Sequence, residues 1–319
     1  MSRLPAANRS SALVCLASDC GITLCADAWD ISYHQLKEIL PTVSGGLELV
    51  VANQIKTLWG VGAGAPGYRF YLEGAEVFLH KGSGTFVHDI VAKRLLYAPI
   101  GAVAPNVTVV PRLTELVRSD GAADVTLDSV TFQHTAVDFS HCFDASSFCE
   151  FQSDGKSSVA AVHWTNSEQI EVVNTTVRHT GGYALWFDSG CTDVFASRMH
   201  IHDLGAGGVR MSGAHNVTLT DSVIEDGGQV WRDAVGVLMQ VANDSRVTHN
   251  TIRRFFYTGI SIGWSWGFEQ NQAGHSVISA NVIHTIGQGE LSVRAITSVY
   301  CDNCVYDYSL RSFAEARGC

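Results

Sequence analysis

The feature that most constrains the fold of this chain is an eight-residue pattern that recurs along its second half. Each copy ends on an apolar residue and has a small or apolar residue five positions earlier. The copies are Val125–Phe132, Ile170–Val177, Val194–Ile201, Val217–Ile224, Ser245–Ile252, Ser276–Ile283 and Asn303–Leu310. Their ends lie 45, 24, 23, 28, 31 and 27 residues apart. A repeat of roughly 20–30 residues with β-branched strands is typical of a solenoid, whose coils bury their apolar faces only by stacking.

A second strand follows four of these segments, on the far side of a Gly-rich corner. These strands are Tyr183–Phe187, Gly208–Met211, Val235–Met239 and Gly259–Ile262. The stretch from Met199 to Met211 shows one whole corner, in which Gly205, Gly207 and Gly208 allow the backbone to turn with a positive φ. Equivalent strands of neighbouring coils should lie about 4.8 Å apart.

Other repeat and β folds fit this pattern less well. A leucine-rich repeat requires a regular Leu frame, which is missing, and a β-sandwich shows hairpin turns about every 8–12 residues. The chain is therefore expected to be all-β, with a right-handed parallel β-helix over residues 107–319. An irregular segment at residues 1–55 and a small β-rich connecting region at residues 56–106 precede it. Within the first segment, Tyr33–Leu40 is expected to form a short helix closed by Pro41.

Composition and motif context exclude several classes of function. The 319 residues carry a formal net charge of -10, which argues against nucleic-acid binding because phosphate contacts need clustered Lys and Arg. No run of 18 apolar residues is present, so no membrane span is expected. Gly62–Gly67 matches G-x-G-x-x-G, but Pro66 lies where the phosphate-binding helix should begin, and no strand–helix units follow. No cofactor is therefore expected.

The nine cysteines leave their pairing open, since an odd number leaves at least one thiol unpaired in a monomer. Cys301 and Cys304 form a C-x-x-C motif without the second pair that a zinc site needs, so no metal site is expected. Cys142 and Cys149 lie in the 45-residue gap, which has room for two coils or for one coil with a long loop. N-glycosylation motifs, the first at Asn8, favour an extracellular location without establishing it. We expect a monomer.

Stacking of coils superposes equivalent residues into columns. Asn250 and Asn281 each precede the end of a segment by two residues, so they should stack as an Asn ladder. A polar column follows two residues after the segment ends and consists of His134, His179, Asp203, Asp226, Arg254 and Thr285. The position just before this column holds His202, Glu225, Arg253 and His284.

Asp203 and Asp226 are the first candidates for catalytic residues. On adjacent coils their backbones would lie about 4.8 Å apart, which is compatible with the roughly 5–5.5 Å between the two carboxyl groups of retaining glycosidases. Such proximity would raise one pKa and give an acid beside an ionised base. In the alternative, structural interpretation, polar residues at a solenoid corner satisfy turn backbone groups or face water. His179, His202 and Arg254 would bind substrate beside the aspartates.

Further candidates come from other stretches. Trp264 and Trp266 lie on a loop that leaves a strand; they would form a sugar-stacking platform if exposed, or cap the coil if buried. Arg210 should point outward by strand alternation and could bind a carboxylate or hydroxyls. The remaining candidates follow the segment that ends at residue 283 and are His284 and Gln288 for binding and Glu290 for catalysis.

Five motifs together resemble right-handed β-helix proteins of the pectin-lyase-like superfamily. They are Arg69-Phe-Tyr-Leu-Glu, Arg94-Leu-Leu-Tyr-Ala-Pro, His202-Asp-Leu-Gly-Ala-Gly-Gly-Val-Arg, Tyr257-Thr-Gly-Ile-Ser-Ile-Gly-Trp-Ser-Trp-Gly and Ile283-His-Thr-Ile-Gly-Gln-Gly. Over about residues 56–290 the chain most resembles the carbohydrate-active proteins grouped in glycoside hydrolase family 141, which includes fucosidase and xylanase activities. The resemblance implies a polysaccharide or oligosaccharide as the partner.

One departure from that family bears on activity. In the family, Gly-Gln-Gly is usually followed by Leu-Ser-Asp, whose Asp is an expected active-site acid, whereas Val293 takes that position here. Family members also continue beyond the point that corresponds to Cys319, with coils expected to supply a second acid. The resemblance implies either that Glu290 or the Asp203/Asp226 pair substitutes, or that the chain is a truncated, inactive relative. A polysaccharide lyase and a noncatalytic carbohydrate-binding module are the alternatives to a hydrolase.

Overall fold

The computed structural model describes the following residues: 21–27, 30–53, 69–89, 92–101, 108–139, 142, 149–151, 159–265, 273–288, 295–299, 301 and 303–306. Within these ranges the regular structure consists of 27 β-strands and one short 3-10 helix, in agreement with the predicted all-β class. The chain divides into two units. The first contains residues 1–27, 31–109 and 139–150, and the second contains residues 28–30, 110–138 and 151–319.

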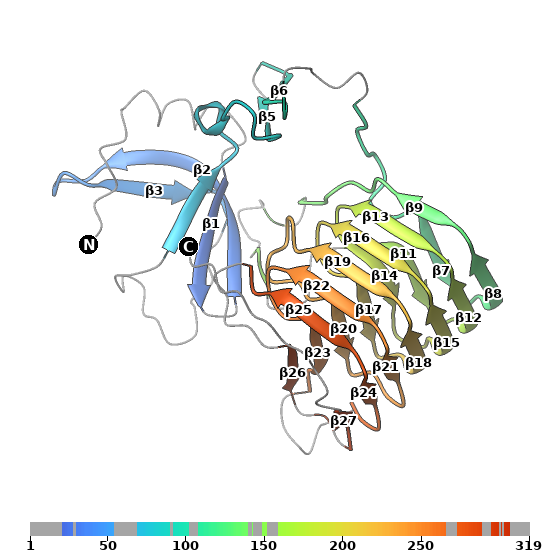
Figure 1. Ribbon diagram of the computed structural model, residues 1–319. Helices are drawn as coiled ribbons and strands as arrows, with labels where there is room; N and C mark the ends of the chain where they lie inside the picture. The colour runs from blue at the N-terminus through green and yellow to red at the C-terminus, as the bar shows by residue number, and fades with distance from the viewer. Residues whose placement is uncertain are drawn as a thin grey trace. The chain divides into compact units, whose positions relative to one another are not determined.

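The first unit contains a five-stranded sheet and a hairpin (Figure 1). The sheet consists of β1 (Gly21–Asp27), β2 (Asp30–Pro41), β3 (Leu47–Val51), β4 (Arg69–Glu73) and β10 (Glu150–Phe151). The 3-10 helix is η1 (Glu76–Phe78), and the hairpin is formed by β5 (Phe86–Asp89) and β6 (Arg94–Tyr97). The strand pairs β1–β4 and β2–β3 are antiparallel.

The helix expected at Tyr33–Leu40 is a wrong prediction, because these residues lie in β2. The second half of β2 pairs with β3 from Leu36 to Pro41, and a turn with Gly45 at φ 80° joins the two strands. Leu36 is buried against Ile22 in the small core of this unit. Cross-strand pairing and burial therefore override the local helical pattern, as they commonly do for β-strands.

The second unit is a parallel β-helix built from three sheets, here called sheets 1, 2 and 3 (Figure 1). Sheet 1 comprises β7 (Val117–Asp120), β11 (Ala160–Thr165), β14 (Tyr183–Phe187), β17 (Val209–Ser212), β20 (Val237–Gln240), β23 (Ile260–Gly263) and β26 (Ile296–Val299). Sheet 2 comprises β8 (Ala123–Asp128), β12 (Glu168–Val173), β15 (Thr192–Ser197), β18 (His215–Thr220), β21 (Arg246–Thr248), β24 (Val277–Ser279) and β27 (Val305–Tyr306). Sheet 3 comprises β9 (Thr131–Gln133), β13 (Thr176–Thr180), β16 (His200–Leu204), β19 (Val223–Gly227), β22 (Thr251–Phe255) and β25 (Val282–Ile286).

The alignment of the coils that the repeat predicts is confirmed for its first six segments. Their last residues are register partners from one coil to the next in sheet 3, beginning with Phe132 opposite Val177. The seventh predicted segment, Asn303–Leu310, begins one residue before the position that the structure gives it. The pairing of β24 with β27 sets Val277 opposite Val305, which brings Cys304 rather than Asn303 opposite Ser276. Strand β27 has only two residues, so few apolar positions fix its register.

The predicted Asn ladder is present inside the coil. Asn250 donates from Nδ2 and from its backbone N–H to Oδ1 of Asn281, at 3.1 and 2.9 Å. Both side chains are 1% exposed. The ladder continues to the preceding coil, where the Ser222 N–H donates to Oδ1 of Asn250 at 3.0 Å. Leaving such a buried amide unpaired costs about 1–3 kcal/mol, so stacking is what makes inward-facing Asn residues acceptable.

The 45-residue gap holds one coil with a long excursion, because β9 pairs directly with β13 and β7 directly with β11. Within the excursion, residues 139–150 belong to the first unit, where Cys142 and Cys149 form a disulfide. Cys301 and Cys304 form a second disulfide, and Cys191 is a buried free thiol among the described cysteines.

The polar column adopts a backbone conformation that the sequence did not reveal. All six residues are left-handed, with φ of 65° at His134, 52° at His179, 58° at Asp203, 56° at Asp226, 57° at Arg254 and 52° at Thr285. Asn, Asp and His enter this region more readily than other non-glycine residues. Backbone geometry alone therefore favours several of the residue types in this column.

The corner glycines have a different role from the one expected. The φ angles of Gly205, Gly207 and Gly208 lie outside the left-handed region. A Cβ on Gly207 would lie 2.1 Å from Tyr183 Cε1 and 2.3 Å from the carbonyl oxygen of Val235. These glycines are therefore required by the close approach of neighbouring coils rather than by a positive φ.

Candidate functional site

Three side chains from adjacent coils stack on the outer face of sheet 1. His163, Trp186 and Arg210 are register partners, and the residues on either side of each point into the core. The rings of His163 and Trp186 are nearly parallel with centroids 4.3 Å apart, and the guanidinium carbon of Arg210 lies 4.0 Å from the ring centroid of Trp186. His163 and Arg210 are only 6% and 8% exposed, so the stack is a rigid feature rather than a set of mobile surface side chains.

Two carboxylates flank the imidazole of His163. Its Nδ1 lies 3.1 Å from Glu115 Oε1, and its Nε2 lies 3.3 Å from Asp188 Oδ2. Glu115 precedes β7, and Asp188 directly follows β14 in a tight turn whose Ser189 N–H donates to Asp188 Oδ1 at 2.8 Å. A neutral imidazole can donate from only one nitrogen, so hydrogen bonds to both carboxyl groups at once require either the doubly protonated ring or a protonated Glu115 that donates to the ring.

The surroundings of Asp188 favour its charged form. Burial would raise the pKa of Asp188, but the hydrogen bonds from His163 and Ser189 and the charges of His163 and Arg210 together outweigh it and lower this pKa below its ordinary value. Asp188 is therefore an ionised carboxylate at neutral pH, suited to act as a base or to stabilise positive charge.

Arg210 lies on the outer face of its strand, as strand alternation predicts, but its guanidinium does not extend into solvent. Its Nε donates to Ser212 Oγ at 3.0 Å, and one terminal nitrogen donates to Gln240 Oε1 at 3.0 Å. Trp264 belongs to the same face, because its Nε1 donates to Ser261 Oγ of β23 at 3.1 Å. The indole of Trp264 is partly exposed, whereas both faces of Trp186 are covered.

The predicted polar column lies on the outer face of sheet 3. His179 Nδ1 is 2.6 Å from Asp203 Oδ2. Asp226 accepts two hydrogen bonds from Arg254, at 2.6 Å from Nε and 2.8 Å from a terminal nitrogen. Each aspartate is thus paired with a basic residue of a neighbouring coil. These contacts fit the structural interpretation of the column and give no support to an acid–base pair of the two aspartates.

Glu225, which was not among the candidates, is the centre of an ionic network on this face. Its carboxylate accepts hydrogen bonds from His200 Nε2 at 2.9 Å, Arg253 Nε at 2.5 Å and Arg254 at 2.7 Å. Burial opposes the charge, but the hydrogen bonds from His200 and Arg253 and the charges of both arginines lower the pKa of Glu225 to about 2. This carboxylate is a fixed charge that binds three coils together.

The candidate residues from the sequence divide between the two faces. Arg210 and Trp264 lie on sheet 1. The candidates on the side of sheet 3 are His179, His202, Asp203, Asp226, Arg254, His284 and, just after β25, Gln288. The ring of His284 lies 3.0 Å from Thr285 Oγ1. Glu290, Trp266 and Val293 lie outside the described residues.

Sequence reasoning missed Glu115, His163, Trp186, Asp188 and Gln240. The column on sheet 1 could have been found by aligning the second strands of the coils in the way that the first segments were aligned. The outward positions of three successive strands would then have shown His163, Trp186 and Arg210 in one row. Glu115 and Asp188 lie outside the strands, and nothing in the repeat marks them.

The fold that carries these two faces is a right-handed parallel β-helix. Residues 160–309 match the family described as "Right handed beta helix region". A solved structure named "Glycoside hydrolase" is similar to this chain with a TM-score of 0.68 and 14% sequence identity, over 94% of this chain and 68% of that one. At this identity the likeness concerns the fold. No curated protein matches the chain.

Among the described residues, no three His, Cys, Asp or Glu side chains converge as ligands for a metal ion. Within the same ranges, no helix has the length and hydropathy that a membrane crossing requires.

Proposed function

We propose that this chain is a glycoside-hydrolase-like β-helix that acts on a polysaccharide at the outer face of sheet 1. The observation that carries the proposal is the pair of carboxylates, Glu115 and Asp188, held on either side of His163 beside a fixed guanidinium. Glycoside hydrolysis requires two carboxyl groups that flank the scissile bond. The similarity in fold to a structure named "Glycoside hydrolase" supports this reading.

The charges of the two carboxyl groups suggest their roles. Asp188 is held in its ionised form by His163, Ser189 and Arg210. Asp188 is then the base that activates a water molecule, and Glu115 is the acid that protonates the leaving oxygen.

The remaining side chains of this face support the carboxylates and suit sugar recognition. Arg210, held by Trp186 and Gln240, is nearly buried, and its fixed positive charge helps to keep Asp188 ionised. Trp264 offers a partly exposed indole, a surface on which sugar rings stack. The motif resemblance to glycoside hydrolase family 141 supports a plant or algal polysaccharide as the substrate class.

The test is a screen of the full chain on defined plant and algal polysaccharides, with new reducing ends and unsaturated sugars both measured. We expect reducing ends without unsaturated products. On the substrate found, Asp188→Asn and Glu115→Gln should each lower kcat by at least about 100-fold, while Asp203→Asn and Asp226→Asn should leave more than half of the rate. The reverse pattern would move the site to sheet 3, and an unsaturated uronide product would identify a lyase instead.

A noncatalytic carbohydrate-binding role is the second candidate, and Val293 at the position of the expected family acid is the observation that favours it. Saturable binding of a polysaccharide without any turnover, weakened by Trp264→Ala, would establish this role in place of hydrolysis. Turnover that survives purification to homogeneity and disappears in Asp188→Asn would exclude it.

A further inference from the structure

A cluster of four histidines lies on the outer face of sheet 3, which is a different sheet from the one proposed for catalysis. The rings of His134 and His179 are stacked with centroids 4.9 Å apart, and those of His200 and His202 are stacked at 4.3 Å. The rings of His179 and His202 meet edge to face at 6.2 Å and join the two pairs. These four residues, from three consecutive coils, are called the histidine cluster below.

Two of the four histidines in the cluster form ion pairs or hydrogen bonds with acidic side chains. His179 pairs with Asp203 and His200 pairs with Glu225. Among the hydrogen bonds between described residues, none involves the ring of His134 or His202, and both side chains are partly exposed. Their ring nitrogens are therefore available to a ligand at the surface.

Arg178 adds a further cation to the same place. It is the register partner of His202 on the neighbouring coil, is partly exposed, and donates from Nε to Gln133 Oε1 at 2.8 Å. A guanidinium held in this way keeps its terminal nitrogens for an external acceptor. Arg178 and the two unengaged histidines thus place several donors on one patch.

The acids on the outer face of sheet 3 leave the positive charge of Arg178 and of protonated histidines largely uncancelled, because most of these acids are already paired. Asp226 is neutralised by Arg254, and Glu225 is bound by Arg253 and Arg254 together. Asp203 pairs with His179, and the charges of Asp203 and Glu225 also favour the protonated form of His202. Histidine is the side chain whose charge changes between about pH 5 and pH 8, so a patch built from four histidines is where a lower pH adds positive charge, although the whole chain carries a net charge of -10.

Mutual repulsion within the cluster links proton uptake to the binding of an anion. Burial first, and then the charges of His200 and His179, lower the pKa of His202 below its ordinary value. An anion placed against these rings would offset the repulsion and raise the pKa of His202 again. By reciprocity, protonation must then strengthen the binding of the anion.

We propose that the histidine cluster, together with Arg178, binds a carboxylate-bearing ligand when the pH falls below neutral. Imidazolium and guanidinium groups are the strong donors to a carboxylate. A metal ion fits less well, because the stacked rings turn their faces to one another and no three described side chains converge as ligands. A nucleic acid fits less well, because binding a phosphate backbone needs clustered Lys and Arg and the whole chain carries a net charge of -10. This proposal is independent of the proposed function.

The experiment is calorimetric titration of the full chain with citrate and with polygalacturonate, at about pH 5 and about pH 7.5. We expect binding at least about tenfold tighter at the lower pH, with proton uptake seen as a dependence of the heat on the buffer. The double variant His179→Gln/His202→Gln should lose at least about tenfold in affinity at the lower pH. Tighter binding of the polymer would identify the ligand as an acidic glycan, and equal affinity per carboxylate would identify a small acid.

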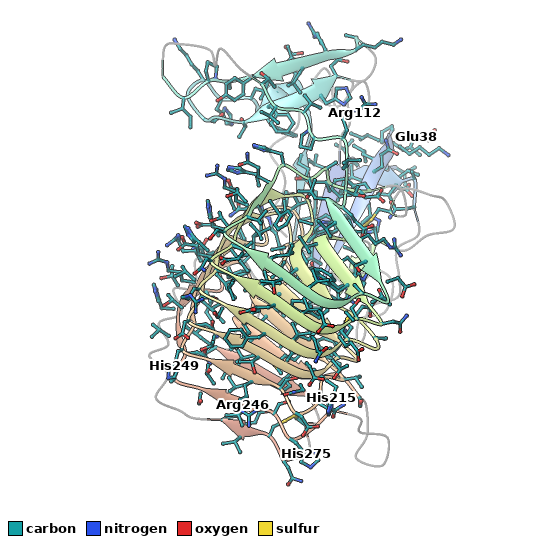
Figure 2. All side chains as sticks on the ribbon, turned by 90° about the vertical axis from the view of Figure 1, so that its right-hand side faces the viewer. Glu38, Arg112, His215, Arg246, His249 and His275 are labelled. Atoms are coloured by element: carbon teal, nitrogen blue, oxygen red, sulfur yellow. A yellow bond between two sulfur atoms is a disulfide. The ribbon has the colours of Figure 1, made fainter. Side chains whose placement is uncertain are left out.

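The matched control is His215→Gln, which removes an exposed histidine that also pairs with an aspartate of the next coil, Asp244 at 3.2 Å, but on sheet 2 (Figure 2). It should bind both probes as the unchanged protein does. An equal loss in His215→Gln, the same affinity at both pH values, or equal affinity for duplex DNA would each overturn the proposal. Thermal melts at both pH values show that the double variant is folded.

Discussion

The ionic network around Glu225 allows a quantitative prediction of stability against pH. The pKa of Glu225 falls from 4.5 to about 2, so its charged form stabilises the folded state above pH 4.5, and this contribution is lost as the pH drops toward 2. One pKa unit corresponds to about 1.4 kcal/mol, which gives about 3 kcal/mol for the full shift. Since Arg253 and Arg254 are about one-third exposed and screened by water, we expect about 2 kcal/mol.

The substitution Glu225→Gln should therefore lower the free energy of unfolding by about 2 kcal/mol at neutral pH, because it also leaves His200, Arg253 and Arg254 facing one another without the anion. The assay is urea unfolding followed by circular dichroism at about pH 7, 4 and 2.5. The difference between the variant and the unchanged protein should be full at pH 7 and mostly gone at pH 2.5.

The matched control is Glu171→Gln, an exposed carboxylate on β12 of sheet 2. We expect it to change the free energy of unfolding by less than about 0.5 kcal/mol at every pH. The reasoning would be refuted if Glu225→Gln cost no more than this control at pH 7. It would be refuted equally if the cost of Glu225→Gln stayed constant down to pH 2.5, since the loss would then come from packing and not from charge.

Three further predictions concern other parts of the chain. Asn281→Ala should cost about 2–4 kcal/mol in urea unfolding, because it removes the acceptor of the buried Asn250 N–H and the donor to the Val247 carbonyl. Gly207→Ala should lower the melting temperature sharply or abolish soluble expression, because its Cβ would meet Tyr183 at 2.1 Å, whereas Gly46→Ala, with Thr42 Oγ1 at 3.2 Å, should be mild. Burial lowers the pKa of His34 to about 4. The stability of the first unit should therefore fall by up to about 3 kcal/mol as the pH drops from 6.5 to 4, and His34→Gln should flatten this slope in unfolding measured over that range.

Most of the fold of the second unit could be predicted from sequence because its core is periodic. A column of apolar residues can be buried only by stacking equivalent positions, so the spacing of the segment ends fixes which residues lie opposite one another. The Asn250–Asn281 ladder follows from the same rule. The rule fails at β27, where two residues carry little pattern, and in the first unit, where β2 is defined by pairing with distant strands rather than by any repeat.

The site was harder to predict than the fold because outward positions carry no burial constraint. His163, Trp186 and Arg210 become a unit only through side-chain stacking between coils, and the acids beside His163 come from a turn and from the chain before β7. The sequence pattern instead predicted a site at the polar column on sheet 3, because this column is rich in Asp and His. The left-handed backbone at each position of the column favours Asp and His, so much of this composition needs no catalytic or binding role to explain it.

The left-handed column also shows which of its residues need an explanation beyond the backbone. His179, Asp203 and Asp226 suit a φ near 55°, but Arg254 at 57° gains nothing from this conformation and bears a cost of about 1 kcal/mol or more. Its compensation is visible in the hydrogen bonds to both Asp226 and Glu225. The strained Arg254 thus joins the ionic network of Asp226 and Glu225, while the ring of His134, at the start of the column, makes no hydrogen bond to another described residue. On a solenoid surface, a residue type that is unfavourable at its φ angle points to an important contact more clearly than a favourable one does. Only the unfavourable residue must be held in that conformation by its contacts.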